Sequence, residues 1–203
     1  MLWKQYLNQK HHLNQIIISE KIKILGIAGS IRKQSFNRSA LNEATKLVPE
    51  NAEIEIFELD ENLPGFNQDK EQDPPAAIID FKKKISEADA LLFVTPEYNY
   101  SVPGILKNYI DWASRPYGDN AFKGKPAAIM GASIGNIASA RAQYHLRQMF
   151  VFLDVTAVNQ PEVMIGMAQN KFDDQGNLTD NDTKDFISKL LVNLVDLTKK
   201  LKT

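Results

Sequence analysis

From residue 22 onward, short apolar runs alternate with longer amphipathic segments. We expect strands over residues 21–28, 53–59, 90–95 and 126–130, and a short fifth strand near 155–158. Residues 90–95 are almost entirely apolar, which is typical of a strand buried on both faces of a parallel sheet. Residues 53–59 alternate between charged and apolar side chains, so this strand has one solvated face and lies near a sheet edge.

The segments between these strands have the spacing of amphipathic helices. We expect one helix over about residues 37–47 and a second that follows a loop over residues 60–75 and ends at about residue 87. Three more helices are expected, one that begins at Pro103 and ends at about residue 113, one over about residues 139–152 and one over about residues 180–200. Thr179 is the expected cap of the last helix. The side chains expected on its buried face are Phe186, Ile187, Leu190, Leu191, Leu194 and Leu201.

Repeated strand–helix units indicate parallel strands joined by right-handed crossovers, with helices on both faces of the sheet. We therefore expect an α/β fold with a doubly wound, five-stranded parallel sheet in the flavodoxin-like order 2-1-3-4-5. We expect residues 21–203 to form one such domain. Residues 1–20 are polar and are expected to be an N-terminal extension, mobile or helical where it docks.

Composition narrows the function classes. The 203 residues include 24 basic and 25 acidic side chains, for a formal charge of −1, so charge gives no argument for nucleic acid or a membrane surface as partner. There is no cysteine, which excludes disulfides, thiolate catalysis, iron–sulfur clusters and cysteine-based zinc sites and fits a cytoplasmic protein. No apolar run approaches the roughly 20 residues that cross a bilayer. We also expect no metal site.

Ligands of open parallel sheets bind beyond the carboxyl ends of the strands. The turn after the first strand contains Ser30, Arg32, Ser35 and Asn37, directly before a helix. Free backbone N–H groups, the helix dipole and a guanidinium suit a phosphate there, and an ordinary helix cap explains the same residues equally well. The turn matches neither a Walker A loop nor a dinucleotide-binding glycine pattern, so a mononucleotide phosphate fits better than a pyrophosphate.

Two further turns lie at the same expected edge of the sheet. The turn over residues 95–104 combines two prolines and a glycine with Tyr98, Asn99 and Tyr100, which offer ring faces and hydrogen bonds to a flat polar heterocycle. A proline-stiffened structural turn is the alternative. The turn over residues 131–136 is small and includes Ser133; close ligand approach and tight turn geometry account for it equally well.

Taken together, these residues resemble the NADPH-dependent FMN reductase family, a flavodoxin-like group that includes quinone, chromate and azo-compound reductases. Residues 29–37 match the pattern G-S-x-R-x-x-S-x-N completely, and residues 96–104 with 106–112 look like the family's flavin-ring signature. Residues 140–147 and 152–154 are similar to the bacterial chromate and quinone reductase branch. The chain departs from the family in residues 1–20 and in Ser139, where that branch tends to have glycine.

The resemblance implies non-covalent FMN, with NADPH or NADH as co-substrate and a small-molecule electron acceptor such as a quinone, chromate, or an azo or nitro compound. Flavin N5 would carry the chemistry in a two-electron, ping-pong reaction, and no side chain would be an essential proton donor. Glu97 would be a loop residue beside the ring and not a base. The residues that would hold FMN are Ser30, Arg32, Ser35, Phe36 and Asn37 at the phosphate and ribityl end, Pro96, Glu97, Tyr98, Asn99 and Tyr100 around the ring, and Ser133 on the third side.

The family also implies a homodimer or homotetramer with the site near a subunit boundary. Arg141, Tyr144 and Arg147 recur at spacings of three on one predicted helix, so they share a face. We expect this face to meet another subunit and, with Tyr100, to shape the acceptor pocket; a solvated face is the alternative. Two rival functions remain, a flavodoxin-type single-electron carrier and a flavin-binding regulatory protein. Such carriers are commonly strongly acidic, and this chain is not.

Overall fold

The computed structural model describes residues 21–202, and the predicted N-terminal extension lies outside the described residues. In chain order the elements are β1 (Ile22–Ala28), α2 (Phe36–Leu47), β2 (Ala52–Phe57), the 3-10 turn η1 (Gln68–Lys70), α3 (Ala76–Glu87), β3 (Ala90–Val94), α4 (Gly104–Ala113), β4 (Pro126–Ala132), α5 (Ala140–Leu153), β5 (Thr156–Ala157), β6 (Val163–Ile165), the 3-10 turn η2 (Ala168–Asn170) and α6 (Asn181–Lys202).

The strands form one parallel sheet in the order β2-β1-β3-β4-β5, which confirms the predicted order and the edge position of β2. A sixth strand, β6, also pairs with β4. β5 pairs with Pro126 and Ala127 at the start of β4, and β6 pairs with the segment from Met130 to Ala132 at its end. The fifth position of the sheet is therefore shared by two short strands, and the prediction of five strands missed one.

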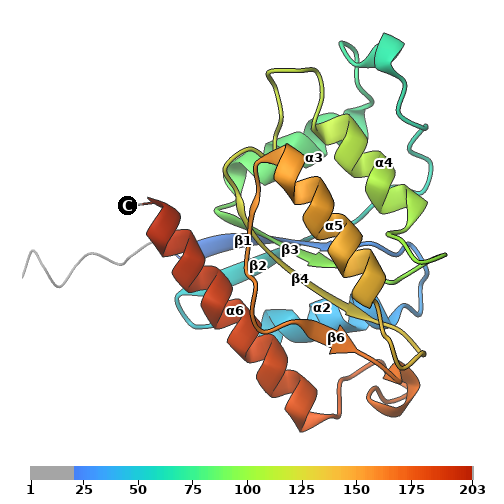
Figure 1. The fold of residues 1–203 in the computed structure, drawn as a ribbon, viewed down its shortest axis with the longest axis vertical. Coiled ribbons are helices and arrows are strands. Elements are labelled where there is room, and N and C mark those ends of the chain that lie inside the picture. Colours follow the sequence, from blue (N-terminus) through green and yellow to red (C-terminus); the bar gives the residue numbers. More distant parts are fainter. Residues whose placement is uncertain (1–20, 203) are drawn as a thin grey trace, which may run out of the picture.

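Helices cover both faces of the sheet (Figure 1): α2 and α6 lie on one face, and α3, α4 and α5 on the other. The alternation of side chains along each strand assigns them to these two layers. In β3, which is buried throughout, Leu92 packs with the α2 and α6 side chains, and Phe93 packs with those of α3, α4 and α5. No helix among residues 21–202 is long and apolar enough to span a membrane.

The last helix departs from the prediction at its start. α6 begins at Asn181, and Asp180 caps it, because its carboxylate accepts the backbone N–H of Thr183 at 3.0 Å. The predicted cap, Thr179, instead donates its hydroxyl to the carbonyl of Lys171. Thr179 and Asp180 are both good capping residues one position apart, and sequence alone does not separate them.

The buried face of α6 is also narrower than predicted. Ile187, Leu190, Leu191 and Leu194 are buried as expected, whereas Phe186 is 49% and Leu201 is 48% exposed. Phe186 precedes Ile187 by one position, about 100° around the helix, so its ring lies beside the sheet-facing stripe and not within it. Leu201 lies in the last turn, among the terminal lysines and past the last buried residue of the helix, Thr198.

Candidate active site

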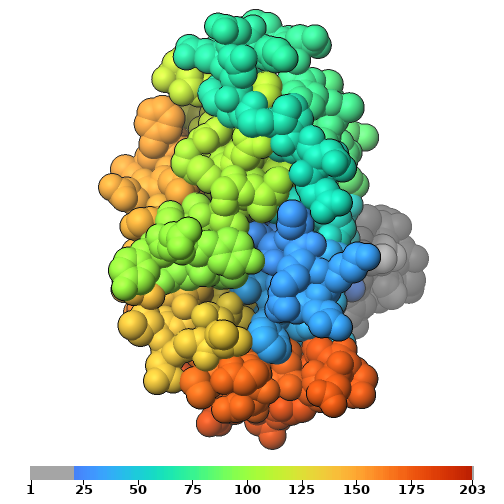
Figure 2. All heavy atoms as spheres, turned by 90° about the vertical axis from the view of Figure 1, so that its right-hand side faces the viewer, coloured from blue at the N-terminus to red at the C-terminus, as the bar shows by residue number. Residues whose placement is uncertain are grey.

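Three turns meet at one edge of the sheet because the strands before them end in register. Ala28 of β1 pairs with Val94 of β3, and Val94 pairs with Met130 of β4. Figure 2 faces this edge, where the turns after β1, β3 and β4 lie next to one another in blue, green and yellow. The structure therefore brings together the three turns that the sequence singled out, at the position where open parallel sheets bind ligands.

The first turn presents a helix N-terminus with hydroxyls and a guanidinium. Ser35 caps α2, its Oγ accepting the backbone N–H of Asn37 at 3.2 Å. The Oγ of Ser30 accepts the N–H of Arg32 at 3.3 Å, and the Arg32 side chain is exposed. The first turn of α2 carries no acidic side chain, so nothing there opposes an anion. The positive helix end and the guanidinium thus fit a phosphate.

The two residues that begin α2 contact other parts of the fold. The ring of Phe36 packs against Phe172, with ring centroids 5.5 Å apart. Asn37 is only 3% exposed, and its side-chain amide makes two hydrogen bonds to the backbone of Ala132. In the structure these side chains support the first turn from within.

The second turn is a tight two-residue hairpin. Tyr98 and Ser101 exchange backbone hydrogen bonds, the N–H of each donating to the other's carbonyl at 2.9 and 3.0 Å. The two residues between them, Asn99 and Tyr100, have φ angles of +50° and +66°. Pro96, before the turn, is buried, whereas Tyr98 is 50% and Tyr100 is 66% exposed. The turn therefore presents two tyrosine rings and an asparagine at the edge of the sheet.

Glu97 points away from solvent and toward α5. Its side chain is 6% exposed and accepts the backbone N–H groups of Arg141 and Ala142 at 2.9 and 3.2 Å, so it caps a helix whose own preceding residue, Ser139, makes no side-chain cap. It also forms an ion pair with the Arg141 guanidinium, whose Nε lies 2.5 Å from Glu97 Oε1. That guanidinium in turn lies 3.6 Å from the ring centroid of Tyr100.

The third turn completes a cavity of about 510 Å³. Ser133 is tied to β6, because its N–H donates to the carbonyl of Ile165 at 3.0 Å, and its Oγ accepts the N–H of Gly135 at 3.3 Å. The residues of the second and third turns and of α5 that line the cavity include Asn99, Tyr100, Arg141, Ser133, Asn136 and Ile137. The volume and the mixed polar and apolar lining suit a flat heterocycle.

Arg141, Tyr144 and Arg147, which were predicted to share one face of α5, make different contacts in the structure. Arg141 turns to the cavity, and Arg147 donates to the carbonyl of Val158 at 2.8 Å. Tyr144 is 54% exposed and does not line the cavity. A hydrogen bond to Glu162, and secondly the charge of that carboxylate, raise the pKa of the Tyr144 phenol. The structure thus brings Tyr100 and Arg141 together and leaves Tyr144 on the outer surface.

Sequence reasoning missed part of the cavity wall. Ile134 and Ile137 are 66% and 59% exposed, and Ile137 and Asn136 line the cavity. Isoleucines in a glycine-containing turn after a buried strand are the signal that was available, since an apolar side chain there has no strand neighbour to cover it. Nothing in the sequence indicated Glu162 as the partner of Tyr144.

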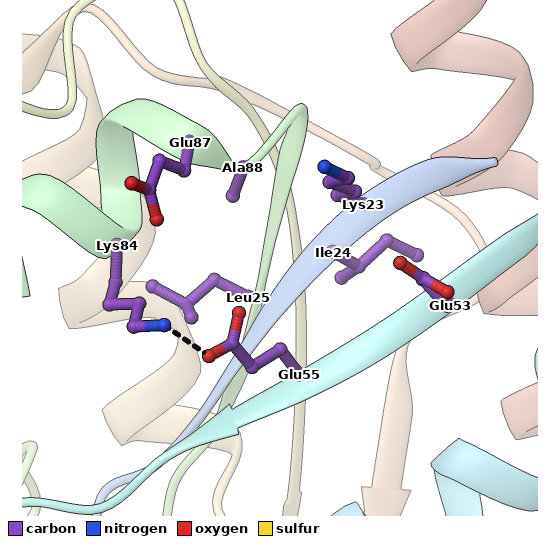
Figure 3. A pocket seen from close by; sticks show the side chains of 8 residues that line it. All are labelled: Lys23, Ile24, Leu25, Glu53, Glu55, Lys84, Glu87 and Ala88. Atoms are coloured by element: carbon purple, nitrogen blue, oxygen red, sulfur yellow. Dashed lines mark hydrogen bonds and ion pairs between the residues drawn. The ribbon is translucent and has the colours of Figure 1, made fainter. Parts of the chain in front are cut away.

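A second cavity, of about 390 Å³, lies at the other end of the sheet, beside the start of β1 (Figure 3). Charged side chains line it, and Lys84 of α3 binds Glu55 of β2 with an Nζ–Oε1 distance of 2.6 Å. That hydrogen bond, with the charge of Glu55, raises the pKa of Lys84. None of the three turns reaches this cavity. Within residues 21–202, no group of three or more His, Cys, Asp or Glu side chains is placed to bind a metal.

Comparison with known proteins places the chain among flavin enzymes. The family described as NADPH-dependent FMN reductase matches residues 22–170, which include all three turns. An NAD(P)H-dependent FMN reductase of Pseudomonas aeruginosa is 53% identical over 175 residues, covering 86% of this chain and 94% of the relative. A quinone reductase of Escherichia coli K12 is 40% identical over 188 residues, covering 91% of this chain and all of the relative.

A solved structure shows the same likeness in three dimensions. The flavoenzyme NAD(P)H:(acceptor) oxidoreductase FerB of Paracoccus denitrificans superposes with a TM-score of 0.80 at 36% sequence identity, covering 88% of this chain and 97% of that protein. The overall fold is therefore shared with a known flavoenzyme.

Proposed function

Because the chain belongs to the NADPH-dependent FMN reductase family, we propose that it uses NAD(P)H and non-covalently bound FMN to reduce quinones or similar electrophiles such as chromate, azo or nitro compounds. The observation that carries this proposal is the position of a phosphate-type helix N-terminus and a 510 Å³ cavity at the same edge of the sheet. A mononucleotide with a planar ring needs both features, one for each end.

The first turn is proposed to hold the phosphate and ribityl end of FMN. Ser30 and Ser35 supply short hydroxyls, and Arg32 supplies an exposed cation beside the N-terminus of α2. Phe36 and Asn37 contribute here by packing beneath this turn. Charge-assisted hydrogen bonds from the guanidinium and the dipole of the 12-residue helix both favour the dianionic phosphate.

The second and third turns are proposed to enclose the ring. Pro96, Glu97 and Tyr98 shape the chain on one side, and Asn99 and Tyr100 present their side chains at its bend. Ser133, fixed against β6, closes the third side of the site. These residues bind and orient, and none is required as a proton donor.

FMN held by these turns would supply two-electron redox chemistry between NAD(P)H and the acceptor, so that a quinone that gains two electrons and two protons becomes its hydroquinone. The protein lines the cavity with side chains of the second and third turns and of α5. It also holds Arg141 as an ion pair with Glu97, so the cavity wall carries no isolated buried charge.

An anaerobic titration of the FMN-loaded protein with NADPH and, separately, NADH tests this function. We expect the visible flavin absorbance to bleach at one equivalent in a single two-electron step and to return on addition of 1,4-benzoquinone. A protein that ignores both nucleotides, yet takes up electrons from dithionite in two separate steps, would instead be a single-electron carrier. Failure to bind FMN at all would remove the assignment.

Assembly into a homodimer or homotetramer is part of the same proposal. Tyr144 and Val151 lie on one face of α5 at a spacing of seven residues, with Phe152 beside them, and the three are 54%, 83% and 72% exposed. An apolar stripe of this kind on a helix is typical of a surface that a partner covers. Light scattering after gel filtration tests this assembly, and a monomer with full turnover would contradict it.

We also propose that the protein is located in the cytoplasm, which cell fractionation tests.

A further inference from the structure

Tyr100 occupies a backbone conformation that its side chain disfavours. Its φ of +66° and the +50° of Asn99 belong to the left-handed region. Asparagine adopts this region readily, whereas a tyrosine Cβ is crowded by the neighbouring carbonyl there. Strained residues of this type persist only where surrounding contacts hold them, and they concentrate at functional sites. The contacts around Tyr100 therefore bear on its role.

The contact that holds the ring comes from α5. The Arg141 guanidinium lies 3.6 Å from the ring centroid of Tyr100, which is cation–π stacking over one face of the ring. Tyr100 remains 66% exposed as a residue and lines the cavity, so it still presents surface there beside the stacked guanidinium. The stacking thus leaves one aromatic surface available to a ligand.

Arg141 is itself immobilised by Glu97. The carboxylate accepts the Arg141 backbone N–H at 2.9 Å and pairs with the guanidinium of the same residue. One buried side chain therefore fixes both the backbone and the head group of Arg141. A second link joins the turn to the same helix, because Ser101 Oγ and His145 Nδ1 lie 3.0 Å apart. The hairpin is consequently anchored to α5 on both sides of Tyr100.

We propose that Glu97 and Arg141 are positioning residues that fix the ring of Tyr100 as a preformed stacking surface, and that this surface gives the enzyme its preference for planar aromatic acceptors. The proposal rests on the proposed function, since it places the acceptor in the cavity beside the flavin ring. A ring held in place in advance binds a planar acceptor without loss of its own rotational freedom. An acceptor that needs no stacking gains nothing from the arrangement.

A double-mutant cycle tests the proposal. The variants are Arg141→Met, Tyr100→Ala and the double variant, all assayed at saturating FMN with NADPH and two acceptors, 1,4-naphthoquinone and ferricyanide. We expect each single variant to lower kcat/KM for the naphthoquinone by about threefold to tenfold, mainly through KM, as aromatic stacking energies imply. The double variant is expected to lose no more than Tyr100→Ala alone, and for each variant the loss with ferricyanide is expected to be smaller than the loss with the naphthoquinone.

Glu97→Gln extends the cycle, because it keeps a side chain of the same size and removes the ion pair. We expect Glu97→Gln to lower the naphthoquinone kcat/KM when Tyr100 is present, and to lower it by a smaller factor when Tyr100 has been replaced by Ala. Lys83→Met, which breaks an exposed ion pair with Glu87 on α3, is the control and is expected to change neither acceptor.

Additive losses in the double variant, or equal losses for both acceptors, would overturn the proposal and leave Glu97 and Arg141 as structural residues only. The proposed function has its own readout, the FMN affinity and the NADPH bleaching of each variant. A protein that bleaches normally but shows no coupling refutes the inference alone, whereas an unmutated protein that does not bleach refutes the function.

Discussion

Asn37 and Ala132 lie 95 residues apart in the chain and exchange two hydrogen bonds. The Asn37 amide donates to the Ala132 carbonyl at 2.9 Å and accepts the Ala132 N–H at 2.8 Å. The pair joins the start of α2 to the last residue of β4, and thereby holds the first turn next to the third. Neither strand pairing nor helix packing alone would set that spacing, because both turns lie beyond the sheet.

Replacement of Asn37 by Ala is expected to weaken this junction before any ligand binds. The Ala132 N–H and carbonyl lose buried partners, so the free energy of unfolding of the apoprotein should fall by about 1–3 kcal/mol, measured by urea denaturation. Affinity should fall for both FMN and riboflavin, since the Asn37–Ala132 pair sets the spacing of the first and third turns. Asn42→Ala, on the exposed side of α2, is the matched control and should stay within about 0.5 kcal/mol. A loss confined to FMN would instead assign Asn37 to the phosphate.

Arg32→Ala is expected to weaken the binding of FMN and to leave the binding of riboflavin nearly unchanged. The guanidinium is exposed beside the N-terminus of α2, where a phosphate would gain a charge-assisted hydrogen bond. We expect the Kd for FMN to rise about tenfold and the Kd for riboflavin, which lacks the phosphate, to change little, as measured by quenching of flavin fluorescence. Lys33→Ala controls for the loss of one positive charge from the same turn. Equal weakening of both flavins would show that Arg32 acts on the fold of the turn.

Gly131 is expected to tolerate no side chain. A Cβ at this position would lie 2.1 Å from Ser139 Oγ and 2.1 Å from the Thr95 carbonyl oxygen. Gly131→Ala should therefore destabilise the protein by about 3 kcal/mol, seen as a lower thermal midpoint. Adding Ser139→Gly should not restore stability, because the Thr95 oxygen belongs to the backbone of the sheet edge. Full rescue would show that only the serine hydroxyl obstructs the position. Gly104→Ala, which meets nothing within 4 Å, is the control.

The sheet was predictable because its signals are local. The apolar run that became β3 indicates burial on both faces, and the alternation in β2 indicates an edge, whatever the rest of the chain does. β6 was not predictable in this way: its three residues, Val163–Ile165, are too few to show a period, and they form a strand only because the end of β4 has an unpaired side.

The candidate site was predictable as a set of turns but not as a set of contacts. Residues at strand ends and helix starts can be read from position alone, which is why Ser35 was recognised next to α2. The direction of Glu97 depends on where α5 begins, and its partner Arg141 is 44 residues away. The partner of Asn37 was equally hard to predict, because a polar residue at a helix start can bind a ligand or a distant backbone group. Long-range partners of short polar side chains require the tertiary structure.

Asp180 gives the stability of α6 a dependence on pH. Its carboxylate hydrogen-bonds Thr183, chiefly through the hydroxyl and also through the backbone N–H, and Lys171 is nearby; together these contacts lower the pKa of Asp180 despite partial burial. Because the pKa is lower in the folded than in the unfolded protein, the stabilisation is complete above the ordinary value of 3.8 and is lost as the pH falls through the folded pKa.

Asp180→Ala is therefore expected to reduce the free energy of unfolding by about 1 kcal/mol at pH 7. The difference from the unmutated protein should shrink as the pH is lowered from about 5 toward 2, followed by urea denaturation at each pH. Asp180→Asn keeps an acceptor for the Thr183 N–H but has no titrating group, so it should lie between the two at pH 7. A gap between Asp180→Ala and the unmutated protein that stays constant down to low pH would show that the carboxylate charge contributes nothing to the cap.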